Sequence, residues 1–192
     1  MQKQLLAALK RYPVFTVRDI AGVLGKKMNY AYLVAHRLKK AKAIYEIEKG
    51  KYSLEEDPFL VASWVVWPSY LSCWAALNYY KLTEQLPFTL QVVTTRKRKR
   101  KVISFANAKI EFIRVKKPAF FGFRRVLYRD KEIFVAEKEK ALVDALATRK
   151  MTLGEALEII RSNGRKLNKN KVFAHARLYR GLAKKIRGVL HD

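Results

Sequence analysis

The sequence predicts an α+β protein in which a small helical unit ending in a β-hairpin precedes a larger unit built on a β-sheet. Two observations support this fold class. Over residues 5–42 and again after residue 137, apolar side chains recur every three to four positions, which is typical of amphipathic helices. Between these regions, short segments alternate apolar and polar side chains or are rich in β-branched residues, which is typical of strands.

The first 54 residues predict three helices and a hairpin. Leu5, Leu6 and Leu9 form the apolar stripe of the first helix. Thr16 and Asp19 form an approximate capping box for the second helix, which Gly25 ends as a C-cap. The third helix covers residues 29–42, and its apolar stripe is Ala31, Val34, Ala35, Leu38 and Ala41. Residues 44–48 and 52–54 then predict two strands joined by a turn at 49–51.

This order of elements is the pattern of a winged helix-turn-helix. The polar face of the third helix can enter a major groove about 12 Å wide, and the tip of the hairpin can contact phosphates. The candidate DNA-binding residues are Lys26, Lys27, Asn29, Tyr32, His36, Arg37, Lys40, Lys49 and Lys51. The same pattern also fits a protein-interaction module whose charged face is merely solvated.

An acidic segment, residues 55–58, interrupts a basic chain and predicts a linker. We therefore expect a DNA-binding domain over residues 1–56 and a basic α/β domain over residues 58–192. The second domain opens with a short apolar helix over residues 59–67, which Pro68 ends. A second helix follows over residues 69–80, with Ser69 as its cap.

A strand over residues 89–95 leads directly into six consecutive cations. They are Arg96, Lys97, Arg98, Lys99, Arg100 and Lys101. Such a run can follow any phosphate backbone, so these residues are the candidate phosphate contacts of the second domain. The alternatives are that the run is solvated or faces an acidic partner.

Further strands are expected over residues 102–105, 109–115, 122–128 and 132–136, giving an antiparallel sheet of four or five strands. The chain then predicts C-terminal helices that begin near Glu137, Thr152, Asn168 and Gly181. Within the first of these helices, Lys140 and Asp144 are four residues apart and predict an ordinary surface ion pair.

The charge of the chain is its strongest compositional feature. There are 41 Lys and Arg against 16 Asp and Glu, a net charge of +25. A field of this sign attracts nucleic acid or, less often, an anionic membrane surface. The longest apolar run falls far short of the roughly 20 residues of a membrane span, and the sequence shows no signal peptide. The single cysteine, Cys73, is expected to be a buried thiol, and we expect a cytoplasmic protein without a membrane partner.

The sequence contains no recognisable pattern of catalytic or metal-binding residues. The three histidines lack metal-ligand spacing, and the eight glycines are scattered singly rather than forming a phosphate-binding loop. Glu137, Glu139 and Asp144 could be taken as a metal cluster, but the interspersed Lys138 and Lys140 favour surface ion pairs. We therefore expect no catalytic residues, no metal and no cofactor.

Four motifs carry a resemblance to a known family. They are Tyr70-Leu71-Ser72 with Trp74-Ala75-Ala76-Leu77, the segment Leu82-Thr83-Glu84-Gln85-Leu86-Pro87, Val92-Val93-Thr94-Thr95 with its basic tail, and Glu139-Lys140-Ala141-Leu142-Val143-Asp144. Together with the N-terminal pattern they resemble the AbiEi-type antitoxins of type IV toxin–antitoxin systems, over most of residues 10–150.

The resemblance implies two activities. One is neutralisation of a nucleotidyltransferase-like toxin, functionally if not by contact. The other is repression of the protein's own promoter by binding double-stranded DNA at an inverted-repeat operator, which fits a dimer on the DNA. In this family the N-terminal domain carries DNA binding, and the second domain carries antitoxicity and helps in DNA contact. The family supplies no catalytic residues.

Two other function classes remain open. An RNA-binding accessory protein could stack bases on aromatic residues that lie near cations, namely Phe120, Phe121, Phe123 and Tyr128. The competing interpretation places these rings in the core, because they alternate along the chain. The other class is a plain winged-helix transcriptional regulator whose second domain senses a ligand.

Overall fold

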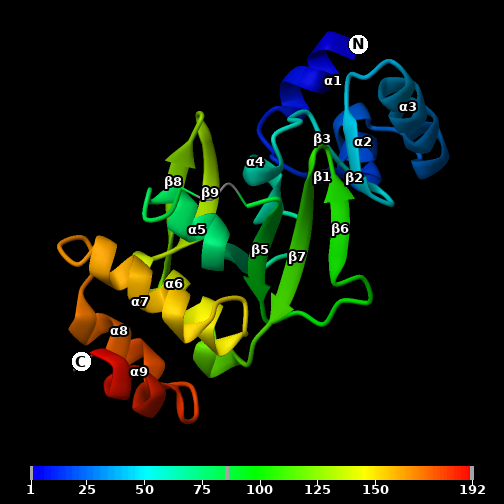
Figure 1. Ribbon diagram of the computed structural model, residues 1–192. Helices are drawn as coiled ribbons and strands as arrows, with labels where there is room; N and C mark the ends of the chain where they lie inside the picture. Colours follow the sequence, from blue (N-terminus) through cyan, green and yellow to red (C-terminus); the bar gives the residue numbers. More distant parts are fainter. Residues whose placement is uncertain (1, 85–86, 191–192) are drawn as a thin grey trace.

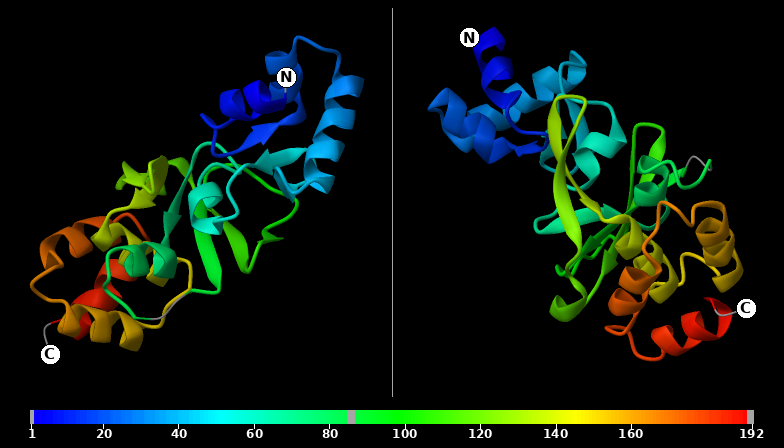
Figure 2. Two further views of the ribbon diagram at one scale, coloured as in Figure 1. Left: turned by 90° about the horizontal axis from the view of Figure 1, so that it is seen from above. Right: turned by 90° about the vertical axis from the view of Figure 1, so that its left-hand side faces the viewer.

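The computed structural model describes residues 2–84 and 87–190, and over these residues the chain is a mixed α+β protein (Figure 1). Gln85 and Leu86, which belong to one of the resemblance motifs, lie outside the described residues. The described residues form a three-stranded sheet and a six-stranded sheet. The N-terminal helices and the C-terminal helices lie at opposite ends of the molecule (Figure 2).

The smaller sheet belongs to the N-terminal elements, whose strands follow the order β1-β3-β2. These elements are α1 (Gln2–Leu9), β1 (Phe15–Thr16), α2 (Val17–Leu24), α3 (Met28–Lys40), β2 (Tyr45–Glu48) and β3 (Lys51–Ser53). The predicted capping box is confirmed, since the Thr16 hydroxyl accepts from the amide of Asp19 while the Asp19 carboxylate accepts from the amide of Thr16. Gly25 ends α2 with a left-handed φ of 61°. The predicted hairpin is present as β2 and β3.

The larger sheet differs from the prediction in size and in direction. It has six strands in the order β6-β7-β5-β4-β9-β8. The strands are β4 (Ser69–Ser72), β5 (Thr89–Thr94), β6 (Val102–Phe105), β7 (Ala108–Arg114), β8 (Phe123–Tyr128) and β9 (Lys131–Ala136). The pairs β5–β7 and β4–β9 are parallel. The expected antiparallel sheet of four or five strands is therefore wrong: the sheet is mixed, and β4 adds a central strand.

Residues 69–80 were expected to form one helix, and this is the largest local error. Ser69–Ser72 is the strand β4, and helix α5 (Cys73–Tyr79) begins only afterwards. All four residues of β4 are buried, so the strand shows none of the alternation that reveals a half-exposed strand. The Ser69 hydroxyl donates to the carbonyl of Ser63 and does not cap a helix.

The helix expected over residues 59–67 is also shorter than predicted. Helix α4 (Pro58–Ala62) ends five residues earlier, and turns and bends lead from it to β4. Asp57 caps α4, since its carboxylate accepts a hydrogen bond from the amide of Phe59. Residues of the predicted linker thus belong to the start of this helix.

The C-terminal helices begin close to the predicted positions. They are α6 (Lys138–Ala147), α7 (Leu153–Ser162), α8 (Lys169–Ala176) and α9 (Leu182–Leu190), and a short 3-10 helix at Lys117–Ala119 precedes β8. Thr152 and Glu155 form a capping box at the start of α7, and Asn168 caps α8. Helices α5 and α6 pack together and contact β5 and β4 respectively, so the buried centre of the sheet lies beneath them.

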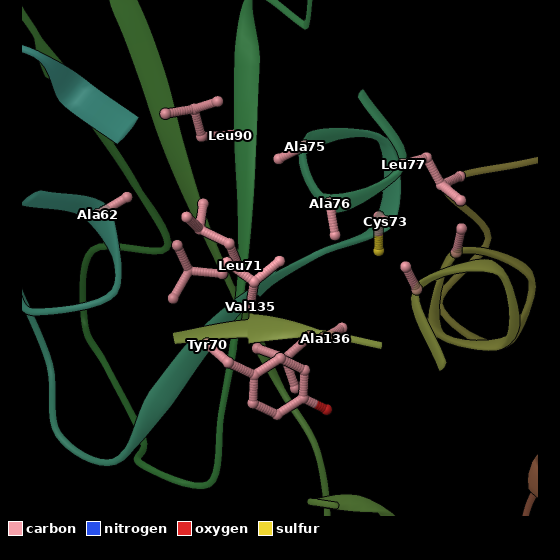
Figure 3. Close-up of a cluster of buried hydrophobic side chains, with 14 of the residues drawn as sticks. Ala62, Tyr70, Leu71, Cys73, Ala75, Ala76, Leu77, Leu90, Val135 and Ala136 are labelled. Carbon is pink, nitrogen blue, oxygen red and sulfur yellow. The ribbon is translucent and has the colours of Figure 1, made fainter. Parts of the chain in front are cut away.

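Two separate clusters of buried apolar side chains hold these elements. The smaller cluster includes Leu9, Ile20 and Leu38, and the larger one extends from Ile47 to Ile186. Figure 3 shows the centre of the larger cluster, where Leu71 and Val135 lie between Ala62 on one side and the α5 residues on the other. Cys73 lies in this cluster, which confirms the expected buried thiol.

Candidate nucleic-acid interface

Helix α3 presents a polar face to solvent and an apolar stripe to the core. Ala31, Ala35 and Leu38 are buried. The predicted DNA-reading residues of this helix are all exposed, namely Asn29, Tyr32, His36, Arg37 and Lys40. Lys26 and Lys27, just before the helix, are exposed as well. The geometry therefore leaves amide, imidazole and guanidinium groups free to contact another molecule along one helix surface.

The tip of the β2–β3 hairpin offers one exposed cation where two were predicted. Gly50 has a left-handed φ of 79°, which the tight turn requires, and Lys49 is exposed beside it. Lys51 is different, because its ammonium group lies 2.9 Å from a Glu48 carboxylate oxygen and also donates to the carbonyl of Val65. Lys51 therefore holds the hairpin against the segment before β4 and is not free at the tip.

The basic run forms the loop from β5 to β6, and its members have different roles. Lys97, Lys99, Arg100 and Lys101 are exposed. The Arg98 side chain is only 13% exposed, donates to Glu48 at 2.5 Å, and places its guanidinium carbon 4.0 Å from the centroid of the Phe112 ring. The charge of Arg98 is thus already paired inside the protein, whereas its prediction as a phosphate contact, like that of the other five cations, stays a prediction. The Arg96 Nε donates to the carbonyl of Trp67 at 3.2 Å.

Glu48 joins the N-terminal elements to the larger sheet through its pair with Arg98, and it also pairs with Lys51 within the β2–β3 hairpin. Its side chain is 16% exposed. Burial acts to raise the pKa of Glu48, but the hydrogen bonds from Arg98 and Lys51 act in the opposite direction, and the net pKa lies below its ordinary value. A second connection is the Lys131 ammonium group, which donates to the carbonyl of Lys10 at 2.5 Å.

Glu48→Gln is expected to lower the free energy of unfolding at pH 7 by about 1–3 kcal/mol, because it removes the charge that two part-buried cations share. A carboxyl whose pKa is lowered by folding stabilises the protein above its unfolded pKa, and this stability is lost as pH falls through the folded value. The gap between wild type and variant should therefore narrow below about pH 4.5. Urea unfolding of both proteins at several pH values measures this difference in free energy of unfolding, and Glu158→Gln, a change at an exposed residue, is the control. A gap that persists unchanged at pH 3 would contradict this role for Glu48.

A second cluster of charged residues is wholly buried, and no sequence pattern predicts its burial. Lys140 and Asp144 form the predicted ion pair, but both side chains are 0% exposed, so the expected surface pair is wrong. The Asp144 carboxylate also accepts from the hydroxyls of Ser72 at 2.8 Å, Tyr179 at 2.7 Å and Tyr70 at 3.1 Å. The network joins β4, α6 and the segment after α8. Its hydrogen bonds satisfy a carboxylate that could not otherwise be buried.

Burial changes the acidity of the groups around this network. It raises the pKa values of Tyr70 and Tyr179 and lowers the pKa of Lys140, although Asp144 acts to raise the latter. Burial also raises the pKa of the Cys73 thiol to about 12, so the thiol is protonated at neutral pH and is a poor nucleophile.

The carboxylates once considered for a metal cluster are engaged elsewhere. Glu137 pairs with Lys171 at 2.7 Å, and Glu139 accepts from the amide of Asn168 at 3.0 Å. Over residues 2–84 and 87–190, no group of three or more His, Cys, Asp and Glu side chains could hold a metal ion. Among the same residues, no helix has the length and apolar character needed to cross a bilayer.

Of the aromatic residues considered for base stacking, Phe120, Phe123 and Tyr128 pack against the larger core cluster. Phe120 and Phe123 contact the ring of the buried Tyr70, at centroid distances of 5.1 and 4.5 Å. Phe121 contacts His175, and Tyr128 contacts Phe59. None of the four is fully exposed, and their rings have partners inside the protein. This arrangement favours the interpretation of these residues as core.

Comparison with known proteins gives no relative: no protein-family model matches the chain, and no curated protein matches it.

Proposed function

We propose that this chain is a winged helix-turn-helix repressor and an antitoxin of the AbiEi type, acting in the cytoplasm without a catalytic step. The observation that carries the DNA-binding half is the α3 surface, where Asn29, His36 and Arg37 are exposed together. The order of helices and hairpin around it supports the same proposal. Amide and guanidinium groups are those that pair with adenine and guanine edges in the major groove.

The antitoxin half rests on the resemblance. Two of its motifs, residues 70–77 and 139–144, meet in the buried network, where Tyr70 and Ser72 both donate to Asp144. Motifs that share one core network support a shared fold better than motifs scattered over a surface would. We propose that the larger α/β region counteracts a nucleotidyltransferase-like toxin, functionally if not by direct contact.

The full-length chain should restore growth to cells that express the toxin encoded beside it, and should repress a reporter under its own promoter. A chain carrying Asn29→Ala, His36→Ala and Arg37→Ala should lose repression and keep rescue, because the two activities use different surfaces. Plating efficiency and reporter activity measure the two. Failure to rescue growth against any adjacent gene product would leave only the plain transcriptional regulator. Loss of both activities in the triple variant would contradict the proposal that repression and rescue use different surfaces.

A further inference from the structure

An exposed tryptophan lies beside the basic run. Trp67 is 56% exposed. Its ring stacks on that of Trp64, with 6.1 Å between centroids and 17° between planes, and it contacts Phe134 at 4.9 Å. The indole NH of Trp64 donates to the carbonyl of Glu132 at 2.6 Å, and this hydrogen bond fixes the position of the Trp64 ring. The three rings thus form an aromatic platform, defined here as Trp64, Trp67 and Phe134, in which Trp67 keeps more than half of its surface exposed to solvent.

Two cations, Arg96 and Arg125, lie next to residues of the aromatic platform. The Arg96 Nε donates to the main-chain carbonyl of Trp67 at 3.2 Å, which places the start of the basic run beside this residue. Arg125 is the cross-strand partner of Phe134, so it projects from the same face of the β8–β9 hairpin, and its side chain is 64% exposed. Its ion pair with Glu132 is exposed and weak. The surface therefore combines a pre-positioned aromatic ring with positive charge.

This combination suits the unpaired bases of a nucleic acid. Base faces are hidden by stacking in a duplex, whereas in a single strand each base can stack on an aromatic ring while the phosphates follow nearby cations. A protein partner with an apolar surface would have to bury the Arg96 guanidinium and the exposed Arg125–Glu132 ion pair, and taking such charges out of water is costly. In a chain of net charge +25, the complementary partner is a polyanion.

We propose that the aromatic platform, with Arg96 and Arg125, binds single-stranded DNA by stacking an unpaired base on Trp67. The choice of DNA over RNA rests on the proposed function, which brings the chain to DNA. This site is separate from the α3 surface, which contacts duplex DNA, and it uses none of the residues proposed to read bases there.

The test uses the full-length chain and a labelled oligothymidylate of about ten nucleotides, a length within the range of ordinary single-strand sites. Trp67→Ala should weaken binding by about 5- to 150-fold, the measured range for losing one base–aromatic stack. Trp67→Phe keeps an aromatic ring on Trp64 and should bind within about threefold of wild type. Anisotropy of the label measures both affinities.

Intrinsic fluorescence locates the ligand, because base stacking quenches tryptophan emission. Oligothymidylate should quench the wild type and Trp74→Phe alike, and Trp67→Phe should lose about half of the quench or more. Trp74 is the matched control, since its indole NH donates to the carbonyl of Lys150, away from the platform. Unchanged quenching in Trp67→Phe would overturn the proposal even if Trp67→Ala fails to fold.

Three further results would each overturn the proposal. The first is a Trp67→Ala protein that binds oligothymidylate with wild-type affinity, and the second is at least tenfold tighter binding of oligouridylate than of oligothymidylate. The third is a platform that binds a protein partner and no oligonucleotide. Failure here remains distinguishable from failure of the repressor proposal. Operator-duplex affinity depends on the α3 surface and should change by less than about threefold in Trp67→Phe.

Discussion

Asp144→Asn is expected to lower the free energy of unfolding by about 3–5 kcal/mol, the range found when one partner of a buried ion pair is removed. The Lys140 ammonium group has no exposed surface and would lose its counter-charge. The amide would also have to replace a carboxylate that accepts from Ser72, Tyr70 and Tyr179. Urea unfolding of both proteins at pH 7 measures the difference.

Two variants make this test specific. Glu132→Gln breaks the exposed pair with Arg125 and should change stability by no more than about 1 kcal/mol. The double variant Lys140→Met with Asp144→Leu removes both charges and should recover part of the loss. Recovery should be incomplete, because three hydroxyls are left without their acceptor, at about 1–3 kcal/mol for each one that stays buried and unpaired. An Asp144→Asn protein within about 1 kcal/mol of wild type would show that the network is not held by charge.

The second large effect concerns how DNA contacts divide between α3 and the basic run. Alanine at Asn29, His36 and Arg37 should weaken operator binding by about 150-fold or more, which corresponds to three base contacts at the low end of about 1 kcal/mol each. Affinity for random duplex should fall less than about tenfold, because one phosphate contact at most is lost. Duplexes selected by the wild-type protein supply the operator, and titration of both duplexes measures the ratio.

Neutralising Lys97, Lys99 and Lys101 to glutamine should weaken operator and random DNA about equally. It should also flatten the salt slope by up to ~3, since each phosphate contact contributes about 0.9. Arg98→Gln is the matched control within the same loop. Its side chain is committed to Glu48, so it should lower stability and leave the salt slope almost unchanged. An unchanged slope in the triple variant would mean that the run is solvated or meets an acidic partner.

The features predicted correctly from sequence depend on residues a few positions apart. The capping box at Thr16, the C-cap at Gly25 and the hairpin turn at residues 49–51 are set by local hydrogen bonds and by left-handed backbone angles at Gly25 and Gly50. In each case the pattern names its own partner within three or four residues, so the chain need not be folded for the prediction to be made.

The features that were missed depend on partners far along the chain. Strand β4 is buried because β5 and β9 lie on either side of it, and nothing within Ser69–Ser72 records that. Lys140 and Asp144 have the spacing of any surface pair, and their burial depends on Tyr70 and Tyr179, which lie 74 and 35 residues from Asp144.

The basic run shows the same limit for a candidate site. All six residues are cations in sequence, and no local signal separates Arg98 from its neighbours. The difference comes from Glu48, 50 residues earlier, and from the Phe112 ring. The exposed Trp67 was likewise hidden within an apolar run that predicted a helix. Helix α4 ends at Ala62, so Trp67 lies outside the helix, and its side chain is exposed to solvent.

The two apolar clusters have a consequence for the order of events during synthesis. The smaller cluster needs no residue beyond Tyr52 for its buried core, whereas the larger one uses residues as far as Ile186. At about 5–20 residues per second, the ribosome needs roughly 7–27 s to cover that interval. For the part of it between the synthesis of Thr94 and that of Tyr179, β4 and β5 are complete while β9 or Tyr179 is still to come. A nascent chain therefore carries a finished N-terminal unit attached to unpaired apolar strands, and its yield in the cell will depend on chaperones that shield those strands until the last helices arrive.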